Sequence, residues 1–454
     1  MRVLIKTLAW GMAVLVLIGV AAPAVIGWVL ASRFDRTVDE LAVPDYLEVV
    51  SRDFDRGWFQ SQAQVVLKPI GPLCHTRPCP VLTLKSRIDQ GPLAWGADQD
   101  RLTPVLAVVH TRVDPTELWP RYVFSPTPGP VTLVSRVGLD TRGRARLTLD
   151  GITFDVARQN PVAHLETATV RGELQSSVLG RSLHGLRLDW PSFSMVKQSG
   201  GHIGWRGLHV EADAGPAGML TQRRLSADSF TLDNGQGQAT RLSDLRLTTR
   251  EQSGGRTAVS MHIDRLVLPD NTQGTLIVEA NEQGLQPGAW ATVAGRWQQL
   301  GGWSGGALNE PALYQRVLPG LFADGADVHV QRLELATGDG AIRIRGDMSV
   351  PPSLRPVETA TDWLAQLDLD FRLSLPAAFL RRLVAQTAAS ASPAREVEAR
   401  LAALNQRQLI APSDNGKNYS VHLKLHDGRM TINGRRRPQW RSLIDQFQAA
   451  APGL

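Results

Sequence analysis

The amino-acid sequence predicts a mainly β protein: an extended antiparallel sheet or sandwich, α+β overall, with one N-terminal transmembrane helix and a few C-terminal helices. Three observations predict it. The N-terminal region holds a long uncharged apolar stretch, the middle of the chain alternates apolar and polar residues with period two, and clear helical periodicity comes late in the chain. The chain of 454 residues is long enough to bury a substantial core.

The apolar stretch runs from Leu8 to Ala31 without one charged residue. As a helix it would be about 36 Å long, enough to cross a hydrocarbon core of roughly 30 Å. Trp10 and Trp28 lie near its two ends, where indole rings favour the membrane interface. Pro23 and Gly27 are positions at which a membrane helix tolerates a kink.

A cleaved secretory signal and a retained anchor are two interpretations of this stretch. The run is longer than a usual signal core, and the small residues from Ala21 to Ala24 are followed by further apolar residues. Both features favour the anchor. Arg2 and Lys6 outweigh the basic residues beyond the stretch, which nearby acids offset. Residues 1–7 are therefore predicted to be a cytoplasmic stub, residues 8–31 to span the membrane, and the rest to lie on the far side.

Residues 32–54 are predicted to form a polar, partly helical neck. Its apolar residues recur at helical spacing: Phe34, Val38, Leu41, Tyr46, Leu47 and Val50. The neck leads to Gly57, which permits a turn or bulge directly before Trp58 and Phe59. We expect a strand to start here, with both aromatic side chains in the core.

Residues 55–375 are predicted to be the β-rich region. Gly, Asp, Asn and Pro break it into short alternating segments, such as 145–150, 185–189, 225–232, 259–268, 274–279, 326–335 and 341–350. Each strand then has one apolar and one polar face, and the spacing indicates antiparallel hairpins. Helices, a second sheet or a ligand must cover the apolar face. A closed sandwich and an open groove require the same alternation, so both remain open.

Residues 376–454 are predicted to form a helical segment and a closing β-hairpin. Apolar residues share one face over Pro376 to Ala389, and Ser392-Pro393 suits the start of a second helix. Asp427-Gly428 predicts the hairpin turn. A short helix over Trp440 to Phe447 is expected at the end of the chain.

Two cysteines, Cys74 and Cys79, flank a short loop that contains Pro78. The pair suits a disulfide, and with His75 it also suits part of a metal site. No second Cys/His pair completes a tetrahedral site, so the disulfide is favoured. A disulfide requires an oxidising compartment, which agrees with export across a membrane.

Charge and motif spacing argue against several classes of function. The net charge of +6 lacks the concentrated basic stripe that nucleic-acid binding needs. The ten histidines are scattered without metal-ligand spacing, and the Gly-rich segments match neither a nucleophile elbow nor a phosphate loop. The sequence therefore predicts no catalytic residues, no metal site and no cofactor, and a protein that is not an enzyme.

Three short motifs resemble the YdgA-like family of bacterial inner-membrane proteins of uncharacterised function. The first is the run after Asp55, with the matching residues Arg56, Gly57, Trp58, Phe59, Ser61 and Ala63. The second is Gln90-Gly91-Pro92, where Gln90 stands in place of the family's usual histidine. The third is the closing hairpin that ends in Asn433-Gly434, with Arg435 in place of the family's lysine. The resemblance implies a mainly β periplasmic domain tethered to the inner membrane, and no assigned reaction.

Two functions fit these observations best. The first is a non-enzymatic envelope scaffold, anchored in the inner membrane through Leu8 to Ala31, which binds an envelope protein or a second copy of itself. The alternative is binding or transport of lipid or another apolar ligand along a sheet groove, a plan similar to that of AsmA-like proteins. An envelope hydrolase ranks last.

Overall fold

The computed structural model divides the chain into two compact units, Met1–Gly237 and Gln238–Leu454, which are described separately. It describes residues 23–32, 34–35, 38–39, 47–69, 81–91, 105–114, 123–124, 129–138, 142–155, 162–177, 182–214, 220–235, 239–252, 255–268, 271–284, 315, 318–322, 324–352, 355, 357, 359–386 and 393–438.

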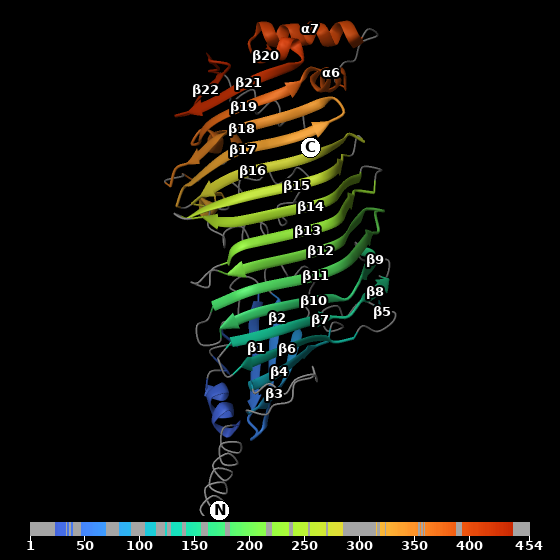
Figure 1. Cartoon of the computed structure of the whole chain (residues 1–454), viewed down its shortest axis with the longest axis vertical. Coiled ribbons are helices and arrows are strands. Elements are labelled where there is room, and N and C mark those ends of the chain that lie inside the picture. Colours follow the sequence, from blue (N-terminus) through green and yellow to red (C-terminus); the bar gives the residue numbers. More distant parts are fainter. Residues whose placement is uncertain are drawn as a thin grey trace, which may run out of the picture. The chain divides into compact units, whose positions relative to one another are not determined.

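The first unit holds thirteen of the strands drawn in Figure 1. They are β1 (Leu47–Asp55), β2 (Gln60–Pro69), β3 (Leu82–Gln90), β4 (Val105–Val113), β5 (Val123–Phe124), β6 (Val131–Gly138), β7 (Arg142–Leu149), β8 (Ile152–Asp155), β9 (Val162–Thr167), β10 (Val170–Ser177), β11 (Ser182–Lys197), β12 (His202–Ala214) and β13 (Leu220–Asp233).

All described pairings in the first unit are antiparallel and join strands that are close in sequence. The order is β1, β2, β3, β4, β6, β7, β10, β11, β12, β13. The long strand β11 pairs with β10 along its first half and with β9 along its second half, and β9 continues to β8 and β5. The unit is thus one open sheet with a short side branch.

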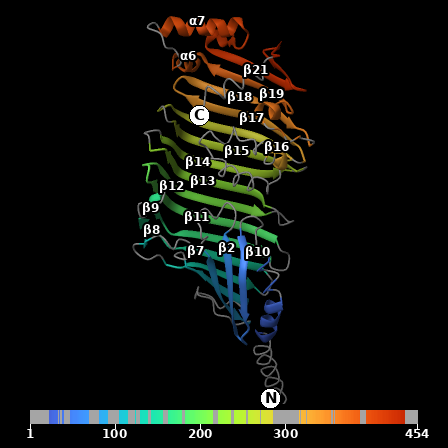
Figure 2. The ribbon, with the colours of Figure 1, turned by 180° about the vertical axis from the view of Figure 1, so that it is seen from behind.

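The sheet of the first unit is strongly twisted. In Figure 2, β2 runs steeply across the direction of β7 and β10. Four pairings separate β2 from β7, and strand pairs twist by about 20–25° each, so the rotation accumulates to roughly a right angle.

The N-terminal residues of the first unit correct part of the predicted neck. Residues 23–32 are helical, and residues 34–35 and 38–39 are also helical. The helical interpretation of Leu47 and Val50 is wrong, because both lie in strand β1, which pairs with β2. Their spacing suits a helix, but cross-strand pairing with β2 decides the conformation.

The second unit contains ten strands and four α-helices among its described residues. The strands are β14 (Ala239–Gln252), β15 (Arg256–Val267), β16 (Gln273–Gln283), β17 (Ala326–Thr337), β18 (Gly340–Val350), β19 (Asp368–Pro376), β20 (Ala411–Ser413), β21 (Asn418–His426), β22 (Arg429–Ile432) and β23 (Arg435–Arg436). The helices are α4 (Leu318–Leu321), α5 (Ala360–Leu364), α6 (Ala377–Gln386) and α7 (Pro393–Gln406), with the 3-10 turn η5 (Asp414–Gly416).

The second unit is also one open antiparallel sheet. Its order is β14, β15, β16, β17, β18, β19, β21, β22, β23, with β20 beside β21. The turn at Asp427-Gly428 between β21 and β22 and the helices α6 and α7 confirm the sequence predictions for these residues.

Helices cover this sheet near the ends of its later strands. Residues of α4 and α5 pack with Phe322, Ala326, Val350 and Leu367. At the opposite end of β19, a second cluster joins α6 and α7 to the sheet through Leu380, Val397, Leu401 and Ile410. The apolar stripes of α6 and α7 are therefore buried against each other and against β19 and β21.

Several predicted features lie outside the described residues. They are residues 1–22 of the stub and apolar stretch, Cys74 and Cys79, Pro92, and the helix expected over Trp440 to Phe447. Among the residues that are described, no helix combines the length and the apolar character needed to cross a membrane.

Replacing Leu401 with alanine tests the cluster under α7. The side chain is 2% exposed, so its truncation should destabilise the second unit by about 2–5 kcal/mol. Hydrogen exchange in α6, α7 and β21 should then become faster. Gln406→Ala, at an exposed position of the same helix, is the control. Unchanged protection in Leu401→Ala would contradict the packing.

Candidate functional site

The N-terminal helical residues lie on the first strands of the sheet through one stripe. Leu30 and Phe34 pack on Ala63, Ile88 and neighbouring residues. Further along, Phe34 and Val38 pack on Val65 and Leu67. The spacing of four residues is that of one helix face.

One aromatic contact and two ion pairs hold the same segment to strand β1. The rings of Phe34 and Phe54 have centroids 5.0 Å apart. Arg52 of β1 donates to Asp39 at 2.6 Å and forms an ion pair with Asp35 at 3.2 Å. Both pairs are exposed, so they orient the segment more than they stabilise it.

A buried polar pair lies under the start of this helix. Gln90 is 4% exposed and Ser61 is 1% exposed. In the amide orientation that satisfies both ends, Gln90 accepts from the Ser61 hydroxyl and donates to the carbonyls of Pro23 (3.1 Å) and Trp58 (3.3 Å). One amide side chain thereby joins the helix, the β1–β2 turn and strand β3. Buried polar groups that are satisfied in this way specify one arrangement.

Two glycines allow the close approach at this pair. A Cβ added at Gly27 would lie 2.5 Å from the Gln90 amide. Gly91 has a φ of +114°, and a Cβ there would lie 2.7 Å from Pro23 Cγ. The sequence indicates Pro23 and Gly27 as sites of a helix kink. In the structure they are the helix residues that contact Gln90 and Gly91.

The first family motif forms the turn between β1 and β2. A Cβ at Gly57 would collide with the Gln60 carbonyl oxygen, which explains the glycine. The carbonyl of Phe59 accepts from the backbone N–H of Gln90 at 2.8 Å. The prediction that Trp58 and Phe59 enter the core is wrong: each is 55% exposed, because the turn points both away from the sheet.

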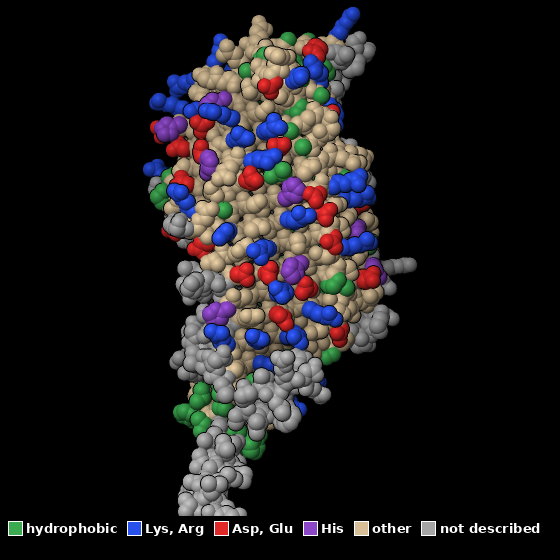
Figure 3. Space-filling model, in the orientation of Figure 1, with side chains coloured by type: hydrophobic (Ala, Val, Ile, Leu, Met, Phe, Trp, Pro, Cys, Tyr) green, Lys and Arg blue, Asp and Glu red, His purple; other side chains and the backbone are tan. Residues whose placement is uncertain are grey.

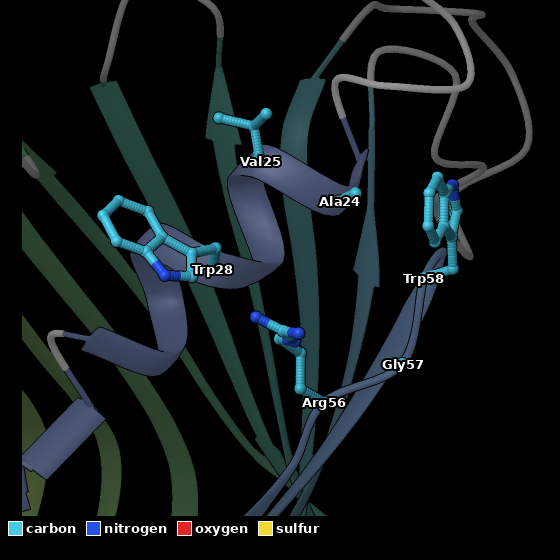
Figure 4. Close-up of a pocket in the computed structure, with 6 residues that line it drawn as sticks. All are labelled: Ala24, Val25, Trp28, Arg56, Gly57 and Trp58. Carbon is cyan, nitrogen blue, oxygen red and sulfur yellow. The ribbon is translucent and has the colours of Figure 1, made fainter.

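A hollow of about 350 Å³ lies between this turn and the helix. Its lining comes from two short segments: Ala24, Val25, Trp28, Arg56, Gly57 and Trp58. Figure 4 shows the two indoles on opposite sides of the hollow, with the side chain of Arg56 between them.

The structure therefore brings together most of the predicted motif residues of the first unit. Ser61, Ala63 and Gly91 lie at the helix contact, and Arg56 to Phe59 form the adjacent turn. The third motif is a separate turn in the second unit. Asn433 and Gly434 have φ values of +50° and +79°, typical of a tight hairpin turn. The Asn433 amide also accepts from the His422 N–H at 2.7 Å.

The sheets present a second candidate surface, which depends on strand register. In the first unit, one cross-strand row consists of side chains of alternating charge: Arg146, Glu173, Arg187, Glu211 and Arg224. In each strand, the sequence neighbours of the charged residue point to the opposite face of the sheet. Those residues form an apolar row: Leu147, Gly172, Leu188, Val210 and Leu225.

The same division holds in the second unit. One row contains Arg246, His262, Ile277, Glu334, Arg343, Ser374 and Ser420. The row on the opposite face is entirely apolar: Leu247, Met261, Val278, Leu333, Ile344, Leu373 and Val421. Every member of this apolar row is only partly buried.

Aromatic side chains add to the apolar face of the first unit. Phe193 and Trp205 stack with ring centroids 4.1 Å apart, and Trp190 contacts Trp205 edge-on at 4.8 Å. All three are only partly buried. Large apolar rings therefore lie on a sheet surface and not in a closed core.

The opposite face is charged and internally paired. Figure 3 shows Lys, Arg, Asp, Glu and His side chains over the visible strands. Glu211 accepts from Arg187 at 2.7 Å and from Arg224 at 3.2 Å, and these hydrogen bonds hold its pKa below the usual range. Hydrogen bonds from Lys424 and His422 likewise lower the pKa of Asp370. Within the described residues, no group of three or more His, Cys, Asp and Glu side chains is arranged to hold a metal ion.

The fold and these surfaces define a class of protein: open antiparallel sheets with one charged and one apolar face, and an N-terminal helix held on the first hairpin. The chain belongs to a family of bacterial proteins of unknown function, DUF945, whose model matches residues 5–438. No curated protein matches the sequence. The narrower YdgA-like assignment stays a prediction from the three motifs.

Replacing Gly27 with leucine tests the helix contact. The added side chain would meet the Gln90 amide, so residues 23–32 should move away from the sheet and Gln90 should lose a partner. Hydrogen exchange at the start of β2 and the end of β3 should become faster. Val25→Leu enlarges an exposed position of the same helix and should leave exchange unchanged. Equal exchange in both variants would contradict the contact.

Replacing Asp370 with asparagine tests the charged face. The folded-state pKa of Asp370 lies below its ordinary value of 3.8, so its ion pairs stabilise the unit above that value. This stability is lost as the pH falls through the folded-state pKa. The wild-type protein should therefore melt above the variant at pH 6, by a margin that corresponds to at most about 1 kcal/mol for an exposed pair. The margin should shrink as the pH falls below 3.8; a constant margin would contradict the assignment.

Proposed function

We propose that this chain is a membrane-anchored, non-enzymatic protein of the bacterial envelope that binds lipid acyl chains along the apolar face of its sheets. Of the two functions that the sequence suggests, this is the alternative to the interaction scaffold. The observation that carries it is the partly buried apolar row of the second unit, from Leu247 to Val421.

The chemistry of this face favours an acyl chain over a polar ligand. In an antiparallel sheet the backbone N–H and C=O groups lie in the plane of the sheet and bond to neighbouring strands, so the face offers side chains alone. Along this row the side chains are aliphatic or thioether groups. A hydrocarbon chain covers them without leaving any polar group unsatisfied.

The dimensions of the row are also suitable. It crosses seven strands, and neighbouring strands lie about 4.8 Å apart, so the row extends for roughly 29 Å. The hydrocarbon core of a membrane, about 30 Å thick, is made of the acyl chains of two leaflets, so one acyl chain is shorter than the row and fits along it. Each apolar side chain that it covers contributes about 25 cal/mol per Å² of area removed from water.

The anchored periplasmic location is part of the same proposal. Its support is the uncharged stretch from Leu8 to Ala31, the basic residues Arg2 and Lys6 before it, and membership of a bacterial family. A membrane-attached chain would have lipid as a nearby ligand.

The interaction scaffold is the second candidate, and the charged face supports it. The row of alternating charge in the first unit favours specific contacts with a complementary protein surface or with a second copy of the chain. Such a partner would be bound on the charged face, whereas an acyl chain would be bound on the apolar face.

Two adjacent residues of β16 allow an experiment to distinguish acyl-chain binding from the interaction scaffold. Val278 belongs to the apolar row. Its neighbour Ile277 points to the opposite face of the sheet, where it lies between His262 and Glu334. Both side chains are partly buried. A photoreactive amino acid at position 278 of the full chain should give lipid adducts in intact cells, detectable by mass spectrometry. The same group at position 277 should give none.

Lysine substitutions provide the matched binding test. Val278→Lys introduces a charge into the apolar row and should lower the lipid that co-purifies with the detergent-extracted protein at least tenfold. Ile277→Lys adds the same charge beside Glu334 and should retain lipid at the wild-type level. Equal retention in both variants, or a reproducible protein adduct in place of lipid at position 278, would contradict acyl-chain binding.

A further inference from the structure

The helix over residues 23–32 is apolar on both of its faces. One face, with Pro23 and Gly27, is buried against the sheet. On the other, Val25 is 59% exposed, Trp28 60% and Val29 37%. A helix that lies between a protein and water presents polar residues on its outer side. The outer side of this helix therefore suits an apolar environment.

The adjacent β1–β2 turn continues this exposed surface. Trp58 lies across the hollow from Trp28. Phe59 follows Trp58 in the sequence, and each of the two is 55% exposed. We name the five side chains Val25, Trp28, Val29, Trp58 and Phe59 the interfacial patch. They are most of the large hydrophobic side chains that are exposed in the described residues. Exposed apolar groups gathered at one place mark a contact surface.

A single arginine lies within the interfacial patch. Arg56 is exposed, and its side chain extends between Trp28 and Trp58 (Figure 4). In the part of the chain that the structure describes, no carboxylate forms an ion pair with Arg56 within 4.0 Å, whereas Arg52 on β1 pairs with two. The hollow thus combines two indole rings with an exposed guanidinium group.

We propose that the interfacial patch lies in the headgroup layer of the membrane and that Arg56 binds the phosphate group of an anionic lipid there. The occupant follows from the chain itself. The outer face of the helix, Val25 to Val29, is the last part of the uncharged stretch that begins at Leu8. A segment that leaves the hydrocarbon core passes through the headgroup layer at this end.

The chemistry of each group suits that layer. Indole rings favour the boundary between hydrocarbon and water, where the apolar ring and the N–H are both accommodated. A guanidinium group binds phosphate oxygens through two parallel hydrogen bonds. The Gln90–Ser61 pair fixes the helix against the sheet, so Trp28, Arg56 and Trp58 keep their spacing. The inference rests on membrane attachment and does not depend on acyl-chain binding by the sheets.

A photoreactive phenylalanine analogue at position 59 tests the location of the interfacial patch. The full chain is placed in lipid nanodiscs that contain phosphatidylglycerol and phosphatidylcholine. Position 59 should give phospholipid adducts. Position 171 should give none, because Arg171 is exposed on the same face of β10 as Glu173. Adducts between two copies of the chain, or no adduct at position 59, would overturn the proposal.

Arginine variants test the phosphate contact. Arg56→Gln should lower the retention of phosphatidylglycerol in native mass spectrometry roughly fivefold, the factor expected for one basic side chain near an anionic surface. Arg56→Lys should retain an intermediate amount, because a point charge replaces the two-pronged contact. Arg171→Gln removes an equal charge elsewhere in the same unit and should leave retention unchanged. Equal losses in Arg56→Gln and Arg171→Gln would overturn a specific site.

These results are independent of the test at position 278. Adducts at position 59 without adducts at position 278 would support the interfacial patch and contradict acyl-chain binding by the sheet. Adducts at position 278 without adducts at position 59 would support acyl-chain binding by the sheet and contradict the interfacial patch. Failure of the chain to enter nanodiscs would overturn both the anchor and the interfacial patch.

Discussion

Antiparallel pairing of neighbouring strands is the constraint on which the rest of this structure depends. The ladders satisfy the backbone groups, and the pleat sends successive side chains to opposite faces. In a single open sheet, water can solvate only the face that is polar. The apolar rows through Leu188 in the first unit and Val278 in the second must therefore meet another apolar group. Helices α4 to α7 cover the ends of the later strands, and the row in the middle of β14 to β19 stays partly buried.

The contact between the N-terminal helix and the sheet of the first unit depends on a different interaction, a buried set of hydrogen bonds. An apolar helix can slide on an apolar sheet, because dispersion contacts have little directionality. The buried amide of Gln90 fixes the position of the helix on the sheet, because its hydrogen bonds to Pro23, Trp58 and Ser61 are satisfied in one arrangement. Glycine at positions 27 and 91 is required by that arrangement. The first and second family motifs thus serve one junction between the helix, the β1–β2 turn and β3.

Local patterns predicted much of the secondary structure. Period-two alternation identified strands such as β13 and β15, and the apolar stripe and Ser392-Pro393 identified α6 and α7. The prediction failed for Leu47 and Val50, whose helical spacing is overridden by pairing with β2. It failed again for Trp58 and Phe59, because large aromatic residues at the start of a strand are usually buried, and here a turn directs them outward. The choice between a sandwich and an open sheet depends on pairing between strands, which alternation alone does not encode.

The sequence by itself determined the mainly β class, the order of the late helices, the uncharged N-terminal stretch and the family motifs, because each is a property of consecutive residues. The tertiary structure alone decided three further points: that the sheet of each unit is open, that the apolar residues of successive strands align in rows, and that Gln90 meets Pro23 and Gly27. Each of these depends on register and contact between residues far apart in the chain. A pattern within one segment constrains its own conformation, and only pairing between segments determines which side chains share a surface.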